Sequence, residues 1–442
     1  MESPNLISPQ EKRAASVEAQ AGSAALDGSA VLDSSAVLDG SAALDRSDHR
    51  ALAKRMGLFH QEPSAPGMVF WHPAGWQLYR ALESFVRQVM ERDGYAEVRS
   101  PQLMRRAVWE ASGHWAHFRA NMFGFGEDGA ADESALKPVS CPGHLAVFKA
   151  MAPSYRDLPL RLSEFGLVHR DEAGGALQGL LRLRQFTQDD GHILCAPEQA
   201  EAEVERFLSG VLPFYRACGF EELAVALSTR PEDRAGSDAE WDEGESLLAR
   251  VLDRLGWKYV VQPGAGAFYG PKLEFGMRDR QGREWQCGTI QFDLFMPSRF
   301  NVAYVASDGS RQRPVMLHRA LCGSLERFLG ILLEHHSGRL PLWLAPRQLR
   351  VLPIAEAQRE AAESLLESLR ELGIRADMDA SAESLGRRVA LAHELGIAEL
   401  AVLGAREVNG GQVSSRVGSE QRVSSREQFL EEIAQRAKPP RL

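Results

Sequence analysis

The sequence predicts an α+β domain built on a mostly antiparallel sheet with flanking helices, followed by a smaller α/β domain. Two extended runs at 160–168 and 181–186 flank a polar loop that contains glycine, which is the pattern of a β-hairpin. Short apolar runs broken by glycines at 257–300 predict further strands, with helices to one side of them. After residue 348 strands and helices alternate, which indicates βαβ units and a largely parallel sheet.

Residues 1–47 form a low-complexity tail that we expect to be disordered. Residues 22–45 repeat one hexapeptide four times, as GSAALD, GSAVLD, SSAVLD and GSAALD. Each unit offers one leucine and at most one valine, which is too little apolar surface to offset the entropy of an ordered chain. A β-solenoid needs several stacked turns and capping, so it is the weaker alternative. A transient helix and a partner-binding arm remain open.

The predicted first domain spans residues 48–340 and opens with a long amphipathic helix. Within 76–93 one helical face carries Leu78, Leu82, Phe85, Val86 and Val89. Gly94 follows, as is common just past a helix end, and 95–101 then reads as a strand that stops at proline. A helix and a strand follow within 197–225.

The predicted second domain spans residues 344–442, after a linker at 340–346 that contains two prolines. Its length of roughly 100 residues suffices for one small domain. Three predicted strands alternate with two predicted helices, each of which ends at a glycine. The strands are 349–354, 374–377 and 399–403, and the helices are 355–372 and 384–395.

The composition is that of a globular protein of the reducing cytoplasm. No apolar run approaches the roughly 20 residues of a membrane span, and the N-terminus lacks a secretory signal. The formal net charge of −9 argues against indiscriminate binding to nucleic acid, so we expect neither DNA nor a membrane as a partner. The five cysteines lack the spacing of a disulfide framework, which makes metal binding the better prospect.

The hairpin at 160–192 carries side chains suited to a nucleotide. It contains His169-Arg170-Asp171-Glu172, then Arg182, Arg184, Phe186, Gln188, Asp189, Asp190 and His192. Arginine binds phosphate oxygens bidentately, a carboxylate accepts from an exocyclic amine, and an aromatic ring stacks on a base. An ordinary polar hairpin with arginines on its wet face is the alternative. It would explain one arginine pair better than it explains this whole ordered string.

This stretch resembles motif 2 of the class II aminoacyl-tRNA synthetases, in the threonyl-tRNA synthetase form HR-x-E, a loop, then R-x-F-T-Q-D-D-x-H. The helix and strand at 76–101 resemble motif 1, which builds the dimer interface in that family. Residues 323–328 resemble motif 3, and the C-terminal domain resembles the anticodon-binding domain of these enzymes. The resemblance implies a class II synthetase catalytic domain, an anticodon-binding domain and a homodimer.

The resemblance also implies an ATP site. Arg170 would contact the α-phosphate, Arg327 the γ-phosphate, Glu172 the adenine amine and Phe186 the face of the base, with Mg²⁺ bridging the phosphates. Two further positions match segments that line the family's pocket, namely Lys272 and Gln286. His114 matches a histidine proposed to help deprotonate the tRNA ribose, although a structural turn explains it nearly as well.

A candidate zinc site consists of Cys141, His192 and His318. One thiolate and two imidazoles with an open fourth position suit zinc at a substrate site, but the three residues are too far apart in sequence for spacing to show it. The resemblance implies that they hold one zinc ion per subunit. The residues that it places around the amino acid are Gln188, Asp190, Tyr269 and Gln291.

The implied activity is that of a threonine–tRNA ligase, with ATP, L-threonine and tRNA(Thr) as partners. Because only the repeat tail precedes the predicted catalytic domain, we expect no hydrolysis of mischarged tRNA by this chain itself. Val139-Ser140 stands where the family usually has Met-Asn, which puts the exact amino acid in question. Glu407 and Arg416 match anticodon-reading positions, but Ala380-Ser381-Ala382 and Val417-Gly418 stand where the family commonly has basic or amide residues, which should weaken phosphate contacts.

Two other functions were considered for this chain. A synthetase paralogue could make the adenylate and pass the amino acid to another acceptor, such as a carrier protein. A non-catalytic regulator or tRNA-binding protein would not need to keep Arg170, Glu172, Phe186 and Arg327 together.

Overall fold

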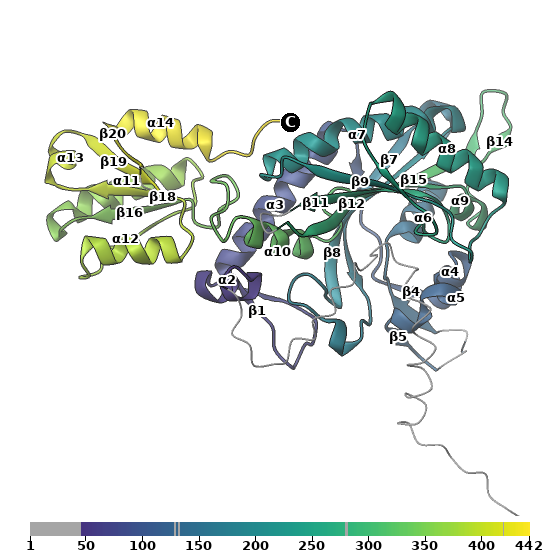
Figure 1. The fold of residues 1–442 in the computed structure, drawn as a ribbon, viewed down its shortest axis with the longest axis horizontal. Helices are drawn as coiled ribbons and strands as arrows, with labels where there is room; N and C mark the ends of the chain where they lie inside the picture. The colour runs from purple at the N-terminus through teal and green to yellow at the C-terminus, as the bar shows by residue number, and fades with distance from the viewer. Residues whose placement is uncertain (1–45, 128–129, 131–132, 279–281, 419) are drawn as a thin grey trace, which may run out of the picture.

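The computed structural model describes residues 46–127, 130, 133–278, 282–418 and 420–442, which fold around two main sheets (Figure 1). The expected disorder of residues 1–45 lies outside the described residues. The larger sheet has the strand order β10-β9-β11-β12-β15-β8-β7-β3, and only its outermost pairs, β10 with β9 and β3 with β7, are parallel. Its strands are β3 (Ala96–Glu97), β7 (Leu160–His169), β8 (Gln185–Cys195), β9 (Leu223–Ser228), β10 (Val260–Gln262), β11 (Lys272–Arg278), β12 (Glu284–Asp293) and β15 (Val315–Ala320). The predicted α+β class is confirmed.

The two faces of this sheet bury different cores, because successive side chains of a strand point to opposite faces. In β8, Ile193 belongs to the main core, which also includes residues of α3 (Pro73–Arg92), α7 (Ala200–Ala217), α8 (Asp238–Arg254) and α10 (Leu325–His335). The next residue, Leu194, belongs to a second core with Leu145 and Phe148 of α6 (Cys141–Met151). Asp190 and His192, which alternate with Ile193 as Leu194 does, therefore lie on the α6 face.

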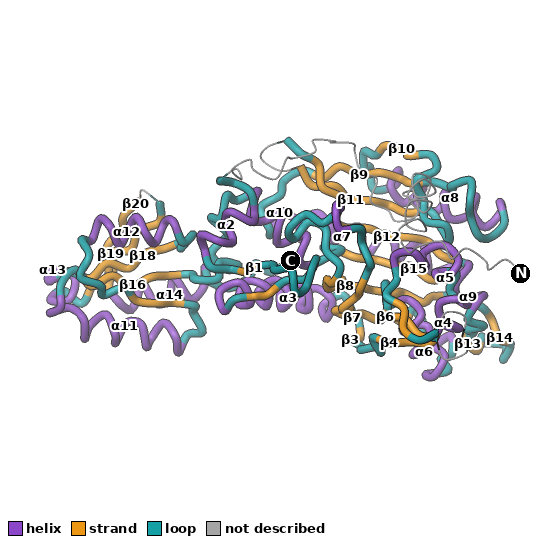
Figure 2. The backbone as a smooth tube through the Cα atoms, turned by 90° about the horizontal axis from the view of Figure 1, so that it is seen from below, coloured by secondary structure: helices purple, strands orange, loops and turns teal. Residues whose placement is uncertain are grey.

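Smaller elements surround this sheet (Figure 2). The helices are α2 (His49–Met56), α4 (Arg106–Ala111), α5 (His114–Phe118) and α9 (Phe295–Arg299). The short strands are β1 (Phe59–His60), β2 (Phe70–Trp71), β4 (Leu103–Arg105), β5 (Gly124–Phe125), β6 (Ser134–Leu136), β13 (Tyr304–Val305) and β14 (Arg311–Gln312).

The predicted second strand of the hairpin, 181–186, is only partly right, because β8 runs from Gln185 to Cys195. Leu181 and Leu183 lie in an irregular turn before β8, and their side chains are buried in the main core. Apolar side chains mark burial here and not strand geometry. Ten residue pairs between β7 and β8 still form the antiparallel hairpin that the sequence predicts.

The second sheet has the order β17-β16-β18-β19-β20 and is built from the C-terminal residues. The three expected strands are present and parallel, as β16 (Leu349–Pro353), β17 (Ala376–Met378) and β18 (Glu399–Leu403). Two antiparallel strands were not expected, namely β19 (Gln412–Val417) and β20 (Glu420–Ser425). The helices are α11 (Arg359–Glu371), α12 (Leu385–Glu394), α13 (Ala405–Asn409) and α14 (Arg426–Arg436).

The C-terminal part lies beside the α2 and α10 end of the larger part (Figure 1). Arg55 of α2 donates from Nε to the backbone oxygen of Glu394 at 3.1 Å. The chain then returns, so that Leu442 packs against the main core of the larger part. Within the described residues, no helix combines the length and apolar character needed to cross a membrane.

The first turn of α10 is tied to β8 through a buried carboxyl group. Glu326 Oε2 accepts from the backbone N–H of Thr187 at 2.9 Å. Burial raises the pKa of Glu326 to about 7, although hydrogen bonds from Thr187 and Ser324 oppose the shift. The neutral acid is therefore favoured in the folded state. Its contribution to the free energy of unfolding is fully present below the unfolded pKa of 4.5 and is lost as the pH rises through about 7.

Glu326→Gln is consequently expected to unfold like the wild type near pH 4 and to be more stable at pH 8, by at most about 3 kcal/mol. Chemical unfolding at the two pH values measures this difference. Glu334→Gln on the same helix is the matched control, because hydrogen bonds from His49 and Arg283 outweigh its burial and lower the pKa of Glu334. That variant should lose stability at pH 8. A pH-independent gain for Glu326→Gln would contradict the argument.

Candidate active site

A cavity of about 130 Å³ opens on the α6 face of the larger sheet. Residues at alternate positions of neighbouring strands line it, because they share one face. Most of the predicted site residues are brought together here: His114, Cys141, Arg170, Gln188, Asp190, Tyr269, Lys272, Gln291 and His318. The other lining residues are His117, Phe118, Val139, Ala267, Phe268, Thr289, Arg319 and Ala320.

The predicted metal ligands converge at one end of this cavity. His192 of β8 and His318 of β15 are direct cross-strand partners, and His192 Nε2 lies 3.0 Å from His318 Nδ1. Cys141 is the first residue of α6, and its Sγ lies within 4.8 Å of a ring nitrogen of each histidine. All three residues are buried. A tetrahedral zinc ion would hold its nitrogen ligands about 3.4 Å apart, so this donor set needs little adjustment.

The hydrogen bonds around these ligands fit a bound cation. His318 Nε2 lies 2.8 Å from Asp293 Oδ2. The Nε2–H of His318 therefore donates to the Asp293 carboxylate, which leaves a lone pair on Nδ1. Burial, together with His144 and His318, lowers the pKa of His192, which favours the neutral ring that a metal requires. Burial and the nearby Asp190 and Asp293 raise the pKa of Cys141, so a thiolate here needs a positive ion beside it. These residues therefore fit zinc.

Two acceptors beside these ligands have no hydrogen-bond partner among the described residues. They are Asp190 Oδ2 and Gln188 Oε1, both buried. Buried polar atoms are nearly always paired, so both are suited to receive hydrogens from a ligand. The hydroxyl of Tyr269, in the turn before β11, donates to Gln291 Oε1 of β12 at 2.6 Å, which fixes both side chains at the cavity.

Arg170 follows β7 at the other part of the cavity, between two aromatic rings. Its guanidinium carbon lies 5.2 Å from the centroid of Phe186 and 5.5 Å from that of Phe118. Phe118 was not predicted, because it belongs to the short helix α5 and no motif spacing distinguishes it. Phe186 and Glu172 are not among the residues that line the cavity. Glu172 forms an ion pair with Arg182, with Oε2 2.8 Å from Arg182 Nη2.

Motif 3 is brought alongside motif 2 by backbone contacts. Asp189 N–H donates to Gly323 O at 3.2 Å, and Gln188 forms an isolated bridge with Ser324. Ser324 then caps α10, since its Oγ accepts from the backbone N–H of Arg327 at 3.1 Å. Arg327 Nε is buried and has no hydrogen-bond partner among the described residues.

Lys272 and Gln286 are both held by one acid. Lys272 is buried at the cavity, with Nζ 2.8 Å from Glu274 Oε1. Gln286 donates to the same carboxylate but does not line the cavity. Lys272 therefore lies at the cavity with its ammonium group paired to Glu274, whereas Gln286 contacts Glu274 from outside the cavity lining.

His114 lies at the cavity with one ring nitrogen already engaged. Ser112 Oγ donates to Trp109 O at 3.1 Å, so it must accept from His114 Nδ1, which is 2.9 Å away. The neutral ring then carries its proton on Nδ1 and leaves Nε2 as the acceptor. This tautomer is the one that a general base at Nε2 would need.

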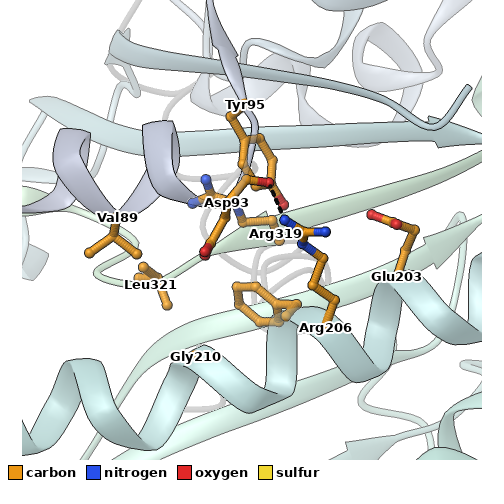
Figure 3. Close-up of a pocket in the computed structure, with 9 residues that line it drawn as sticks. Val89, Asp93, Tyr95, Glu203, Arg206, Gly210, Arg319 and Leu321 are labelled. Carbon is orange, nitrogen blue, oxygen red and sulfur yellow. Dashed lines mark hydrogen bonds between the residues drawn. The ribbon is translucent and has the colours of Figure 1, made fainter. Parts of the chain in front are cut away.

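Arg319 is a further buried residue of the site that the sequence did not reveal. It lines both the cavity and a small pocket where its guanidinium faces Tyr95, with the ring centroid 4.2 Å away (Figure 3). Its Nη1 lies 3.7 Å from Asp189 Oδ2. A Cβ at Gly191 would collide with the Arg319 Nε, which explains the glycine between Asp190 and His192.

The two predicted anticodon residues lie on different elements of the second sheet region. Glu407 Oε2 accepts from the backbone N–H of Gly404 at 2.9 Å and so caps α13. Arg416 lies on β19, and its Nε is buried with no partner among the described residues. Capping already accounts for the Glu407 carboxylate.

Comparison with known proteins identifies both parts of the chain. Residues 123–336 match the tRNA synthetase class II core domain (G, H, P, S and T), and residues 348–436 match the anticodon binding domain. The chain is 46% identical over 397 residues to a threonine–tRNA ligase of Nitrosomonas europaea, covering 88% of this chain and 62% of that protein. It is 50% identical over 344 residues to the enzyme of Thiobacillus denitrificans, covering 78% and 54%. The chain thus spans less than two thirds of these relatives.

A solved structure matches over nearly its whole length. The crystal structure of the RNA binding domain of threonyl-tRNA synthetase from Cryptosporidium parvum superimposes with a TM-score of 0.86 at 38% identity, covering 89% of this chain and 99% of that one. The chain therefore belongs to the threonyl-tRNA synthetase family of the class II aminoacyl-tRNA synthetases.

Proposed function

We propose that the chain is a threonine–tRNA ligase, which activates L-threonine with ATP and transfers it to tRNA(Thr). The observation that supports this most is that Cys141, His318 and the unpaired Asp190 oxygen lie at the cavity that Arg170 also lines, with His192 buried against His318. One end of the site suits a hydroxylated amino acid, and the other suits a phosphate.

At the amino-acid end, Cys141, His192 and His318 would hold one zinc ion per subunit, a Lewis acid with an open position for the amino and hydroxyl groups of threonine. Asp190 would accept the hydroxyl proton, with Gln188 beside it. Tyr269, from the turn before β11, and Gln291 of β12 would orient the amino acid. Valine has the same shape but lacks the hydroxyl, and a site built to bind a hydroxyl rejects such an analogue by about 10⁴–10⁵-fold.

At the ATP end, Arg170 and Arg327 would hold the α- and γ-phosphates, with Mg²⁺ bridging the phosphates. Phe186 would stack on adenine, while Glu172 and Gln286 would bind around the base and ribose. A threonine carboxylate oxygen then forms a bond to the α-phosphorus, and pyrophosphate leaves with the bonding electrons. Lys272 would add positive charge at the reacting groups.

The same chain would bind tRNA and a second copy of itself. His114 would accept the ribose proton through Nε2, and Glu407 and Arg416 would contact the anticodon. A homodimer would cover the exposed aromatic residues near α3, where Trp76 is 46% exposed and Phe70 is 39% exposed. The absence of disulfide-type cysteine spacing supports a cytoplasmic location.

Two assays on the purified full chain test the proposal. Threonine-dependent ATP–pyrophosphate exchange reports the adenylate, and charging of tRNA(Thr) reports the transfer. We expect both activities, with valine supporting far less exchange than threonine. Exchange without charging would instead support transfer to another acceptor, such as a carrier protein. Absence of exchange would contradict the proposal.

A further inference from the structure

His144 is a fully buried histidine whose two ring nitrogens both have partners. It lies in the first turn of α6, three residues after Cys141. Its Nδ1 is 2.7 Å from His192 Nδ1, and its Nε2 is 3.2 Å from Glu164 Oε2. The planes of the two histidine rings meet at 88°. His144 thus lies directly between a metal ligand and a buried carboxylate.

The direction of these hydrogen bonds follows from Glu164. Burial alone would raise its pKa, but hydrogen bonds from His144, Lys137 and Ser100 outweigh burial and bring the pKa to about 2. An ionised carboxylate only accepts, so His144 Nε2–H must donate. The Nδ1 of a neutral His144 is then an acceptor. His192 must therefore donate from its Nδ1, which leaves the His192 Nε2 lone pair facing His318 and Cys141.

The carboxylate is itself held rigidly and is already balanced in charge. Lys137, which is 0% exposed, donates from Nζ to Glu164 Oε1 at 2.7 Å and to Ser100 Oγ at 2.9 Å. Ser100 adds bonds to Glu164 from its backbone N–H and its hydroxyl, at 3.1 and 2.7 Å. Because Lys137 neutralises Glu164, no positive charge on His144 is needed.

Close packing keeps His144 at this anchor. A Cβ at Gly143 would come within 2.5 Å of Ser100 Cβ. Only glycine at this position therefore lets α6 pack so closely against Ser100. On the other side of the metal ligands, Asp293 fixes His318 in the same way. With the proton of His192 on Nδ1 and that of His318 on Nε2, the lone pairs of His192 Nε2 and His318 Nδ1 face each other across 3.0 Å. These lone pairs repel each other unless a cation lies between them.

We propose that His144 is a positioning residue for the zinc ion, acting through His192. Anchored by Glu164 and Lys137, it accepts the Nδ1 proton of His192 and thereby fixes the tautomer in which Nε2 binds metal. The inference rests on the zinc site of the proposed function and adds a role for a residue that does not touch the ion. Loss of such an outer partner typically weakens metal affinity 10–100-fold.

The test measures the zinc dissociation constant of the full chain by competition with a chelator. His144→Leu removes the acceptor and should raise the constant about 10–100-fold. His144→Asn places an amide oxygen near the Nδ1 position and should recover most of the affinity. His335→Leu is the matched control, because His335 is also buried and has Nε2 3.1 Å from the backbone oxygen of Gly219, away from the site. It should leave zinc affinity unchanged.

Each outcome decides a definite point. If folded His144→Leu binds zinc like the wild type, or if the asparagine variant is as weak as the leucine variant, the role of His144 is wrong. Should His144→Leu fail to fold, nitrogen-15 histidine spectra of the zinc-loaded wild type decide instead. The expected result is a proton on His192 Nδ1, and a bare Nδ1 would overturn the inference. A wild type that binds no zinc would overturn the zinc site itself.

Discussion

Arg327→Ala is expected to lower kcat for threonine-dependent ATP–pyrophosphate exchange by about 10³-fold, which corresponds to about 4 kcal/mol of transition-state stabilisation. The side chain follows the Ser324 cap of α10 and lies alongside β8, where its Nε is buried without a partner among the described residues. An arginine held in place beside the phosphates would stabilise the charge that develops on them without reorganising. The loss should therefore appear in kcat and kcat/KM together.

Two further variants show whether charge or shape is responsible. Arg327→Lys keeps the positive charge but loses the planar fork, so we expect it to remain roughly 10²-fold below the wild type. Arg250→Ala removes an arginine that is 57% exposed on α8 and should leave exchange unchanged. Folding of each variant is checked by thermal unfolding. Activity of Arg327→Ala within tenfold of the wild type would exclude a catalytic role for this residue.

The sequence predicted most of the residues at the cavity but not how they are held. Ordered motifs identified Arg170, Asp190 and His192 because their chemistry and order are specific. The pairing of His192 with His318 depends on the register of β8 and β15, which no local pattern contains. The contact of Arg319 with Tyr95 likewise joins segments more than 200 residues apart, so only the folded chain reveals it.

The missed strands have a simpler cause. Strands are found from sequence by alternating apolar residues, and β19 buries only Val413 and Ser414. In β20 a single residue, Ser424, is buried. A mostly exposed, polar strand pair at the edge of a sheet carries no such alternation. By contrast, β16 and β18 are buried along their whole length, and both were predicted within one residue of their observed ends.

Cys141→Ala is expected to remove zinc and threonine activation together. A Cys141 thiolate would be the only anionic ligand of the three, and without it two imidazoles would remain in a buried site. Because the amino and hydroxyl groups of threonine would then lose the ion that binds them, exchange should fall by about 10³-fold or more. Zinc content per chain and exchange activity are measured on the same preparation.

Cys195→Ala is the matched control, because Cys195 is a buried cysteine three residues beyond His192 on the same strand and packs in the main core. Truncating it leaves a small cavity and should lower stability by about 1 kcal/mol, with zinc and exchange unchanged. A stability loss shared by both variants therefore cannot explain a zinc loss confined to Cys141→Ala. If Cys141→Ala lost its zinc but still activated threonine over valine, the discrimination would have to come from Asp190 and Gln188 alone, and the role assigned to the metal would be wrong.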